Sequence, residues 1–390
     1  MKQKIISYLS TEKDDLYKLC NYLYENPEDS YKEHKSCEYI SNFLSQRGFD
    51  VEKNFLGIDN SFIAKKGSGH PKICYLCEYD AIKNEGHITG HNLLTTISVT
   101  ASIALGKIID NFQGTVILIG CPGEYLGGTK STMAHQKVFD DIDIVMEAHP
   151  DIVTCESGTS SAIIPLKVSF LGNNGLKFLN ENNYSSLDAI LCYFSLINSL
   201  SKGLPKDVNI DSILSKGGNT PSLVPLESEA KFYIRSNEMD TAKIIEEKLR
   251  NCANYITELM GIQNSVSLYE PPSEELLTNI TLNRLFSHNL KENGIIDICD
   301  PRNIIAGLSL GSVSHIAPSI HPYISIVEPN STIKYGTKDF AKHTLSEYAQ
   351  EQGLKAALSL AFTGLDLIEN ENLLAEVKSE FFSENKNHIY

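Results

Sequence analysis

Three short strand-like segments, the first of them nearly all apolar, constrain the fold of this chain more than any other feature. They read KICYLCEYD (72–80), GTVILIGCPGE (114–124) and DIDIVMEAHP (141–150), and helical stretches separate them. Strands that are apolar on both faces are typical of a parallel sheet that helices cover on each side. The sequence therefore predicts an α/β domain whose mostly parallel sheet has helices on both faces.

The segments around these strands extend the same domain. Two amphipathic helices are expected within the first fifty residues, the second over 32–46 with its end near Gly48. The β-rich segments DVEKNFL (50–56) and SFIAKKG (61–67) follow them. A long helix with one apolar face is expected over 344–368. We assign this C-terminal part to the first domain, because a lone strand and helix could not bury their own apolar faces.

The middle of the chain has a different order of elements. Between about residues 161 and 272 the patterns predict strand, helix, two strands, helix and strand. This β-α-β-β-α-β order is that of the split ferredoxin-like unit. We therefore predict one domain formed by residues 1–163 and 275–390, and a second, inserted domain formed by residues 164–274.

Composition and charge exclude some classes of function. The chain of 390 residues has a net charge of −15, which opposes binding to nucleic acid. The N-terminus is charged and no apolar run reaches the roughly 18 residues of a spanning helix, so we expect neither export nor membrane insertion. Nine cysteines without a regular framework indicate a reducing compartment, and we expect a cytoplasmic protein. Cys74 and Cys77 form a C-x-x-C, but within a strand they point to opposite faces, which argues against a redox or zinc role.

Polar clusters follow each of the three apolar strands. They are CEYD with the later GHITGHN (86–92), then CPGEYLGG, then MEAHP. Open α/β sheets place their ligands at the carboxyl ends of strands. These clusters offer carboxylates and imidazoles suited to a zinc or manganese site with a carboxylate base, namely Glu78, Asp80, His87, His91, Glu124 and His149.

The motifs and their order resemble the M20 metallopeptidases, most closely the aminobenzoyl-glutamate and β-alanyl-lysine dipeptidase branch. The resemblance is carried by NPEDSYKEH, LCEYDA, GHITGHN, PGEY, AHP, GGNTPSLVP, KFYIRS, GSVSHIAPSIHPY and AFTGLDL, over nearly the whole chain. It implies an amidohydrolase fold whose insert is a lid and dimerisation domain, and hence a homodimer formed through that insert. It also implies two bridged metal ions that serve to cleave a small N-acyl amino acid or dipeptide-like amide.

The resemblance assigns several retained roles. His91 and His149 match ligands of one metal ion, and Glu124 matches the general base that activates water. Arg235 matches a substrate-binding position, although a structural role at the end of a strand is an equally good interpretation.

Other positions of the family pattern are substituted. Thr89 replaces the bridging Cys, Tyr125 replaces a ligand Glu, and Gly336 falls where a ligand His is expected. Leu176 stands where a His polarises the substrate carbonyl, Ser222 where the pattern has Asn, and Ser309 where it has Asp. A neutral Thr hydroxyl is a poor bridge between two dications.

These losses fall on one of the two metal positions and predict at most one ion, of zinc or manganese, or none. Two imidazoles alone bind zinc weakly, so a third donor is needed, from Glu124, His87 or Asp80. Three functions stay open: an amide hydrolase that uses one metal ion and Glu124; a pseudoenzyme that binds a small amide or acyl-amino acid without cleaving it; and a repurposed amide-forming or cyclising enzyme.

Overall fold

The computed structural model describes residues 1–179 and 184–387, and the chain divides into two compact units. The first unit contains residues 1–159, 276–303 and those from 312 onward. The second contains residues 160–275 and 304–311. The sequence-based boundaries assigned residues 160–163, 275 and 304–311 to the larger domain, whereas these residues lie in the second unit.

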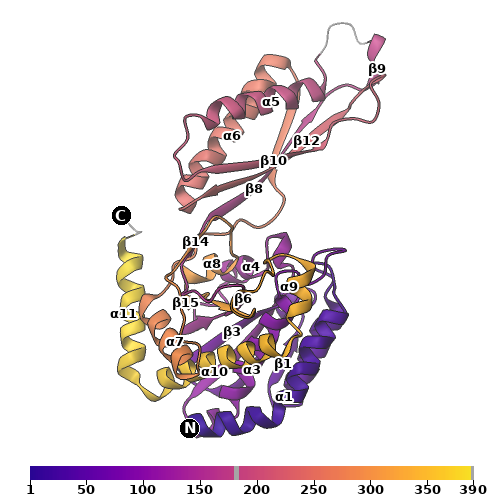
Figure 1. The fold of residues 1–390 in the computed structure, drawn as a ribbon. Coiled ribbons are helices and arrows are strands. Elements are labelled where there is room, and N and C mark those ends of the chain that lie inside the picture. The colour runs from indigo at the N-terminus through magenta and orange to yellow at the C-terminus, as the bar shows by residue number, and fades with distance from the viewer. Residues whose placement is uncertain (180–183, 388–390) are drawn as a thin grey trace. The chain divides into compact units, whose positions relative to one another are not determined.

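A six-stranded sheet forms the centre of the first unit (Figure 1). Its strand order is β1-β2-β4-β3-β5-β15. The pairs β3–β4, β3–β5 and β5–β15 are parallel, whereas β1–β2 and β2–β4 are antiparallel. The strands are β1 (Asp50–Lys53), β2 (Phe62–Ser68), β3 (Lys72–Glu78), β4 (Gly114–Cys121), β5 (Ile144–Met146) and β15 (Ser319–Ile320). The predicted α/β class with a mostly parallel sheet is confirmed.

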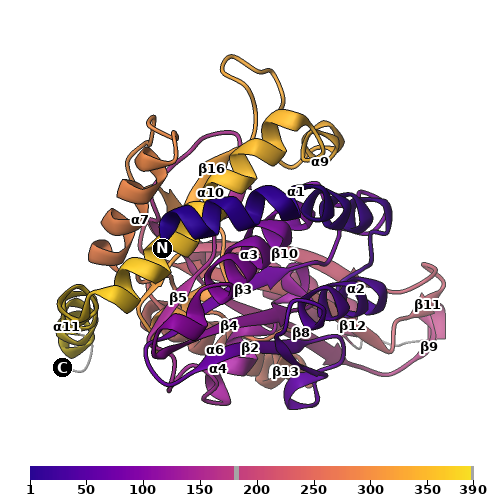
Figure 2. The same ribbon diagram turned by 90° about the horizontal axis from the view of Figure 1, so that it is seen from below.

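Helices cover both faces of this sheet. Helix α3 (His91–Gly106) connects β3 to β4, and α4 (Lys130–His135) lies between β4 and β5. Because β4 and β5 lie on opposite sides of β3, right-handed crossovers place α3 and α4 on opposite faces. Figure 2 shows α1 (Lys2–Glu25), α3 and α10 (Glu347–Glu369) together on one side of the sheet. The carboxyl ends of β3, β4 and β5 therefore meet at one edge.

Helix α3 is the most buried helix of the first unit, since all 16 of its residues are buried. Three of its hydroxyl groups donate to carbonyls of the helix itself, as when Thr100 Oγ1 donates to the Thr96 carbonyl, and Thr95 Oγ1 donates to the Glu78 carbonyl at the end of β3. The stretch His91–Asn111 is long and apolar enough to cross a membrane by length and composition, contrary to the sequence-based expectation. Almost all of it lies inside the protein, which is the usual state of a core helix.

Shorter elements complete the first unit and the boundary with the second. The remaining helices are α2 (His34–Ser45), α7 (Ile280–Glu292), α8 (Leu310–Ser314), α9 (Lys338–His343) and α11 (Glu371–Asn387). The short strands are β6 (His149–Asp151), paired in parallel with β16 (Tyr323–Ser325), and β7 (Thr159–Ser160), paired with β14 (Asn303–Ile304). The pairing of β6 with β16 brings His149 next to Tyr323.

The second unit contains an antiparallel sheet of order β10-β12-β8-β13 with two helices packed on it. In chain order its elements are β8 (Ala162–Leu171), α5 (Ser186–Ser201), β10 (Asn209–Lys216), β12 (Glu227–Ser236), α6 (Met239–Met260) and β13 (Gln263–Leu268). A short ribbon pairs β9 (Gly175–Leu176) with β11 (Leu223–Val224). Residues 304–311 join this unit through backbone contacts, such as the bond from Ser161 N to the Ala306 carbonyl.

Candidate metal centre

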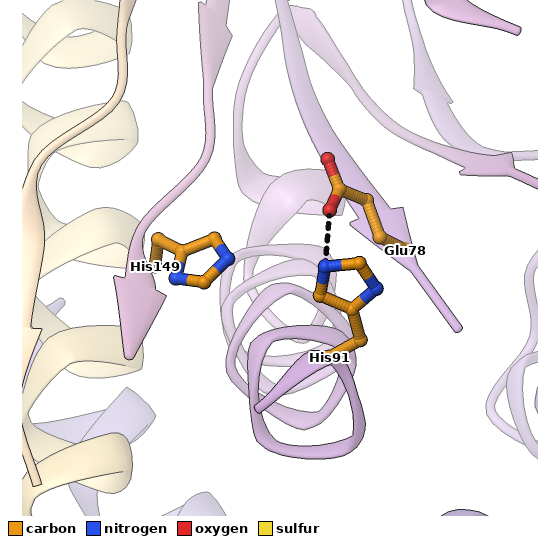
Figure 3. A group of neighbouring side chains, drawn as sticks. All are labelled: Glu78, His91 and His149. Carbon is orange, nitrogen blue, oxygen red and sulfur yellow. Dashed lines mark ion pairs between the residues drawn. The ribbon is translucent and has the colours of Figure 1, made fainter. Parts of the chain in front are cut away.

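Three buried side chains converge at the carboxyl edge of the central sheet. Glu78 is the last residue of β3, His91 is the first residue of α3, and His149 begins β6. One ligand atom from each lies within 4.8 Å of the others, and Figure 3 shows the three side chains pointing toward one another. Two imidazoles and one carboxylate are a donor set that zinc and other divalent transition metals accept.

Asp80 fixes the orientation of His91. The Nδ1 of His91 lies 2.9 Å from Asp80 Oδ1, and its Nε2 lies 3.1 Å from Glu78 Oε2. A carboxylate that accepts from one ring nitrogen of a metal ligand sets which nitrogen faces the ion. His149 is oriented in the same way, because its Nδ1 donates to the Pro150 carbonyl at 2.8 Å and leaves Nε2 as the donor atom for an ion.

The charges of the site are strongly coupled. Burial lowers the pKa of His91, but Glu78 and Asp80 outweigh it and raise that pKa to about 9. Burial raises the pKa of Glu78, but Lys130 and His91 hold it well below its usual range. Burial and the charge on His91 lower the pKa of His149 to about 4. Without an ion, His91 therefore carries the positive charge of the group and His149 is neutral at neutral pH.

A buried lysine adjoins the group. Lys130 begins α4, and its Nζ contacts Glu78 Oε1 and lies 2.8 Å from Glu147 Oε2 and 3.7 Å from Glu124 Oε2. Burial lowers the pKa of Lys130, but the carboxylates, led by Glu124 and Glu147, raise it well above its usual range. Neither residue was among the candidates predicted from the sequence: Lys130 lies outside the polar clusters, and in the cluster MEAHP only His149 was chosen and not Glu147.

Aromatic side chains line the surroundings of His149. The rings of His321, Tyr323 and Tyr335 lie 5.5, 6.0 and 6.2 Å from the ring of His149, measured between centroids. His321 is buried, and its Nδ1 has no hydrogen-bond partner among the described residues. Burial and the neighbouring His149 lower the pKa of His321 to about 3, so it adds no charge at neutral pH.

The other proposed third donors are engaged elsewhere. Asp80 Oδ2 accepts hydrogen bonds from Ser30 and from the backbone N–H of Tyr125. His87 Nε2 bonds to the Leu23 carbonyl, and burial lowers the pKa of His87 to about 4. Glu124 Oε2 lies 3.7 Å from Lys130 Nζ, and the carboxylate that the structure groups with His91 and His149 is that of Glu78. The strand-end position of Glu78 identified it as a polar candidate, but spacing alone did not single it out.

Two substituted positions contact each other. The hydroxyl groups of Thr89 and Tyr125 are hydrogen-bonded, and the Tyr125 ring stacks on His91 with centroids 4.5 Å apart. Gly336 has a φ of +75° and open space where a side chain would stand. None of the three positions carries a His, Cys, Asp or Glu, the residue types that supply the donor group of Glu78, His91 and His149.

The remaining predicted positions lie in the second unit. Leu176 pairs with Leu223 between β9 and β11, and the Ser222 carbonyl accepts from Lys177 N. Ser309 lies in the segment 304–311. Arg235 Nε bonds to Asp211 and its Nη1 to the Ile305 carbonyl, so its contacts are those of a structural cation at a strand end.

Comparison with known proteins gives a consistent result. The Xaa-Arg dipeptidase of Mus musculus is 25% identical over 401 residues, which cover 98% of this chain and 92% of that protein. One of the subunits of the p-aminobenzoyl-glutamate hydrolase of Escherichia coli is 30% identical over 257 residues, which cover 60% of this chain and 53% of that protein. No protein-family model matches the chain.

A solved structure shares the fold. It is a dinuclear metal-binding peptidase of the M20 family from Bacillus subtilis, with a TM-score of 0.62, 15% sequence identity, and coverage of 91% of this chain and 99% of that one. The fold and the donor group define an α/β scaffold with a possible metal-binding group at the carboxyl ends of its strands. Together with the curated relatives, this shared fold supports the M20 amidohydrolase family, near the aminobenzoyl-glutamate branch.

Proposed function

We propose that this protein is an amidohydrolase that cleaves a small dipeptide or N-acyl amino acid with one divalent ion at most. The observation that carries the proposal is the buried group of Glu78, His91 and His149, whose ring nitrogens are already oriented by Asp80 and the Pro150 carbonyl. The curated relatives, a dipeptidase and an aminobenzoyl-glutamate hydrolase, support this class of substrate. Zinc or manganese suits this donor set.

Different residues of the chain would bind the ion, transfer the proton and orient a ligand. Glu78, His91 and His149 would hold the ion, which supplies Lewis acidity toward water and the amide carbonyl. Glu124 takes the proton of the attacking water and passes it to the departing amine, because its carboxylate lies 3.7 Å from Lys130 Nζ, which contacts Glu78, and does not itself belong to the donor group. Asp80 keeps the Nε2 of His91 directed at the donor group.

The test combines metal analysis with hydrolysis. Protein purified without chelator should hold about one zinc or manganese ion, and it should release amine from a panel of dipeptides and N-acyl amino acids. Glu124→Gln should keep the ion and lose hydrolysis by roughly 10²–10⁴-fold, since an amide cannot accept the proton. His149→Ala should lose the ion. Rapid hydrolysis in the presence of chelator would contradict the proposal.

A binding protein without catalytic activity is the second candidate. It is favoured by the contact between Thr89 and Tyr125, which uses two positions of the family's metal pattern for a hydrogen bond within the protein. In that case an N-acyl amino acid should bind in calorimetry and be recovered intact, with or without added metal. Turnover by the wild type that Glu124→Gln abolishes would exclude this alternative.

We also propose that the second unit is a ferredoxin-like lid through which two chains form a homodimer. The strand order of its sheet is that of the split β-α-β-β-α-β unit. Its edge strand β10 is exposed along most of its length, including Ile213 and Leu214, and proteins commonly pair or cover such edges. Light scattering should give the mass of two chains. Ile213→Lys with Leu214→Lys should give one chain, and a monomeric wild type at micromolar concentration would oppose the proposal.

A further inference from the structure

The contacts of Lys130 bear on how many ions the pocket around Glu78, His91 and His149 can bind. Lys130 is buried, and its Nζ contacts carboxylates from three segments: Glu78 at the end of β3, Glu124 after β4 and Glu147 after β5. Glu147 is also buried. Among the described residues, Lys130 is the lysine or arginine that forms an ion pair with it. The lysine is thus built into the group at the same sheet edge as the candidate metal donors.

One contact links the lysine directly to the donor group. Glu78 has one oxygen, Oε1, in contact with Lys130 Nζ, and the other, Oε2, directed at His91 Nε2. Only Oε2 is therefore open to an ion, which makes Glu78 a ligand through a single oxygen. A side chain that holds a ligand in this way orients it as the outer contacts of metal sites commonly do.

The positive charge of Lys130 changes how many divalent ions the carboxylates of the pocket can balance. Three buried carboxylates are present, from Glu78, Asp80 and Glu147, and a fourth comes from Glu124, whose side chain is 7% exposed. When all four carboxylates are ionised and His91 and His149 are neutral, Lys130 and one divalent ion leave a single net negative charge. A second divalent ion would make the pocket positive and would stand close to the ammonium, which is unfavourable in a buried site.

We propose that Lys130 is a permanent cation of the metal pocket that limits it to one divalent ion and holds Glu78 as a ligand through one oxygen. The inference rests on the metal site of the proposed function, but it concerns ion number and affinity and not catalysis. Lys130 is accordingly a positioning residue. Its removal leaves four carboxylates whose charge two divalent ions balance.

The first experiment removes the charge and measures metal binding. Lys130→Met and the charge-preserving control Lys130→Arg are titrated with zinc and with manganese by calorimetry, and bound metal is counted by elemental analysis. The wild type and Lys130→Arg should hold about one ion. Lys130→Met should bind that ion at least tenfold more tightly or take up a second one. Unchanged stoichiometry and affinity in folded Lys130→Met would overturn the inference.

A second variant covers the case in which Lys130→Met does not fold. Glu147→Gln removes one carboxylate that binds the lysine without belonging to the donor group. It leaves the pocket neutral with one ion, so the ion should bind roughly tenfold more weakly, and unchanged affinity would count against the inference. A wild type that holds one ion without hydrolysing any amide would refute the proposed hydrolase while leaving this inference intact. An active wild type, together with a Lys130→Met variant whose ion count and affinity both equal those of the wild type, would do the reverse.

Discussion

Gly128 is the position where a single methyl group tests the role of Glu124. Its φ is +67°, and a Cβ built there would lie 2.6 Å from Glu124 Oε2 and 2.7 Å from Oε1. Ordinary contacts of a Cβ begin near 3.4 Å, so in Gly128→Ala the carboxylate must move by roughly 0.8 Å. A misplacement of about 1 Å at a reacting group can cost on the order of 10²-fold in rate.

The predicted result for Gly128→Ala is a loss of roughly 10²-fold in kcat/KM for an N-acyl amino acid or dipeptide, with the ion still bound. The left-handed conformation by itself costs an alanine about 1–2 kcal/mol of stability. Gly294→Ala is the matched control, because Gly294 has a φ of +88° and nothing within 4 Å of its Cβ position. It should lose similar stability and keep full activity.

The comparison of the two variants gives the decisive measurement. Urea unfolding reports the stability of each, and initial rates with saturating zinc or manganese report catalysis. If Gly128→Ala is as active as Gly294→Ala, then the position of the Glu124 carboxylate does not limit the reaction, and Glu124 is not the base.

Three further predictions follow from the charges and the substituted positions. Burial raises the pKa of Glu33 to about 7, above its usual value, so the contribution of Glu33 to stability is full below about pH 4.5 and is lost as pH rises through 7. Glu33→Gln should therefore be more stable than wild type at pH 8, by on the order of 3 kcal/mol in urea unfolding. The same stability difference between variant and wild type at pH 4 and at pH 8 would refute this prediction. Glu78 and Asp80 raise the pKa of His91 to about 9 against the effect of burial, so binding of zinc at pH 7 should release about one proton. Calorimetry in buffers of different ionisation enthalpy measures this release. A binding enthalpy that does not depend on the buffer would contradict the prediction. A triple variant should raise metal affinity and allow two ions about 3.5 Å apart, which anomalous scattering would detect; its changes are Thr89→Cys, Tyr125→Glu and Gly336→His. Two such ions in the wild-type protein would refute the predicted loss of the second site.

The sequence was sufficient to predict the architecture of the first unit, because its strands are apolar on both faces and helices separate them. It was also sufficient to nominate His91 and His149, since both follow predicted strands in polar clusters. These signals are local, and each depends on a few consecutive residues.

The remainder of the site depends on contacts between distant segments. Lys130 follows a glycine-rich turn and looks like a solvated residue in the sequence, yet carboxylates from β3 and from the segment after β5 surround it. His87 has the same spacing signal as His91 but bonds to the Leu23 carbonyl. Residues 304–311 join the second unit through backbone hydrogen bonds, which leave no pattern in side-chain polarity.

The burial of α3 has a consequence for the timescale on which His91 can move. A helix enclosed along its whole length exposes its amides only when much of the surrounding domain opens, so its hydrogen exchange should approach the limit set by global unfolding. His91 is attached to the first turn of that helix, whereas the loop carrying Gly336 and Tyr335 is largely exposed. His91 is therefore attached to a helix whose amides should exchange slowly. Tyr335, whose ring lies 6.2 Å from that of His149, belongs to an exposed loop that should open more readily.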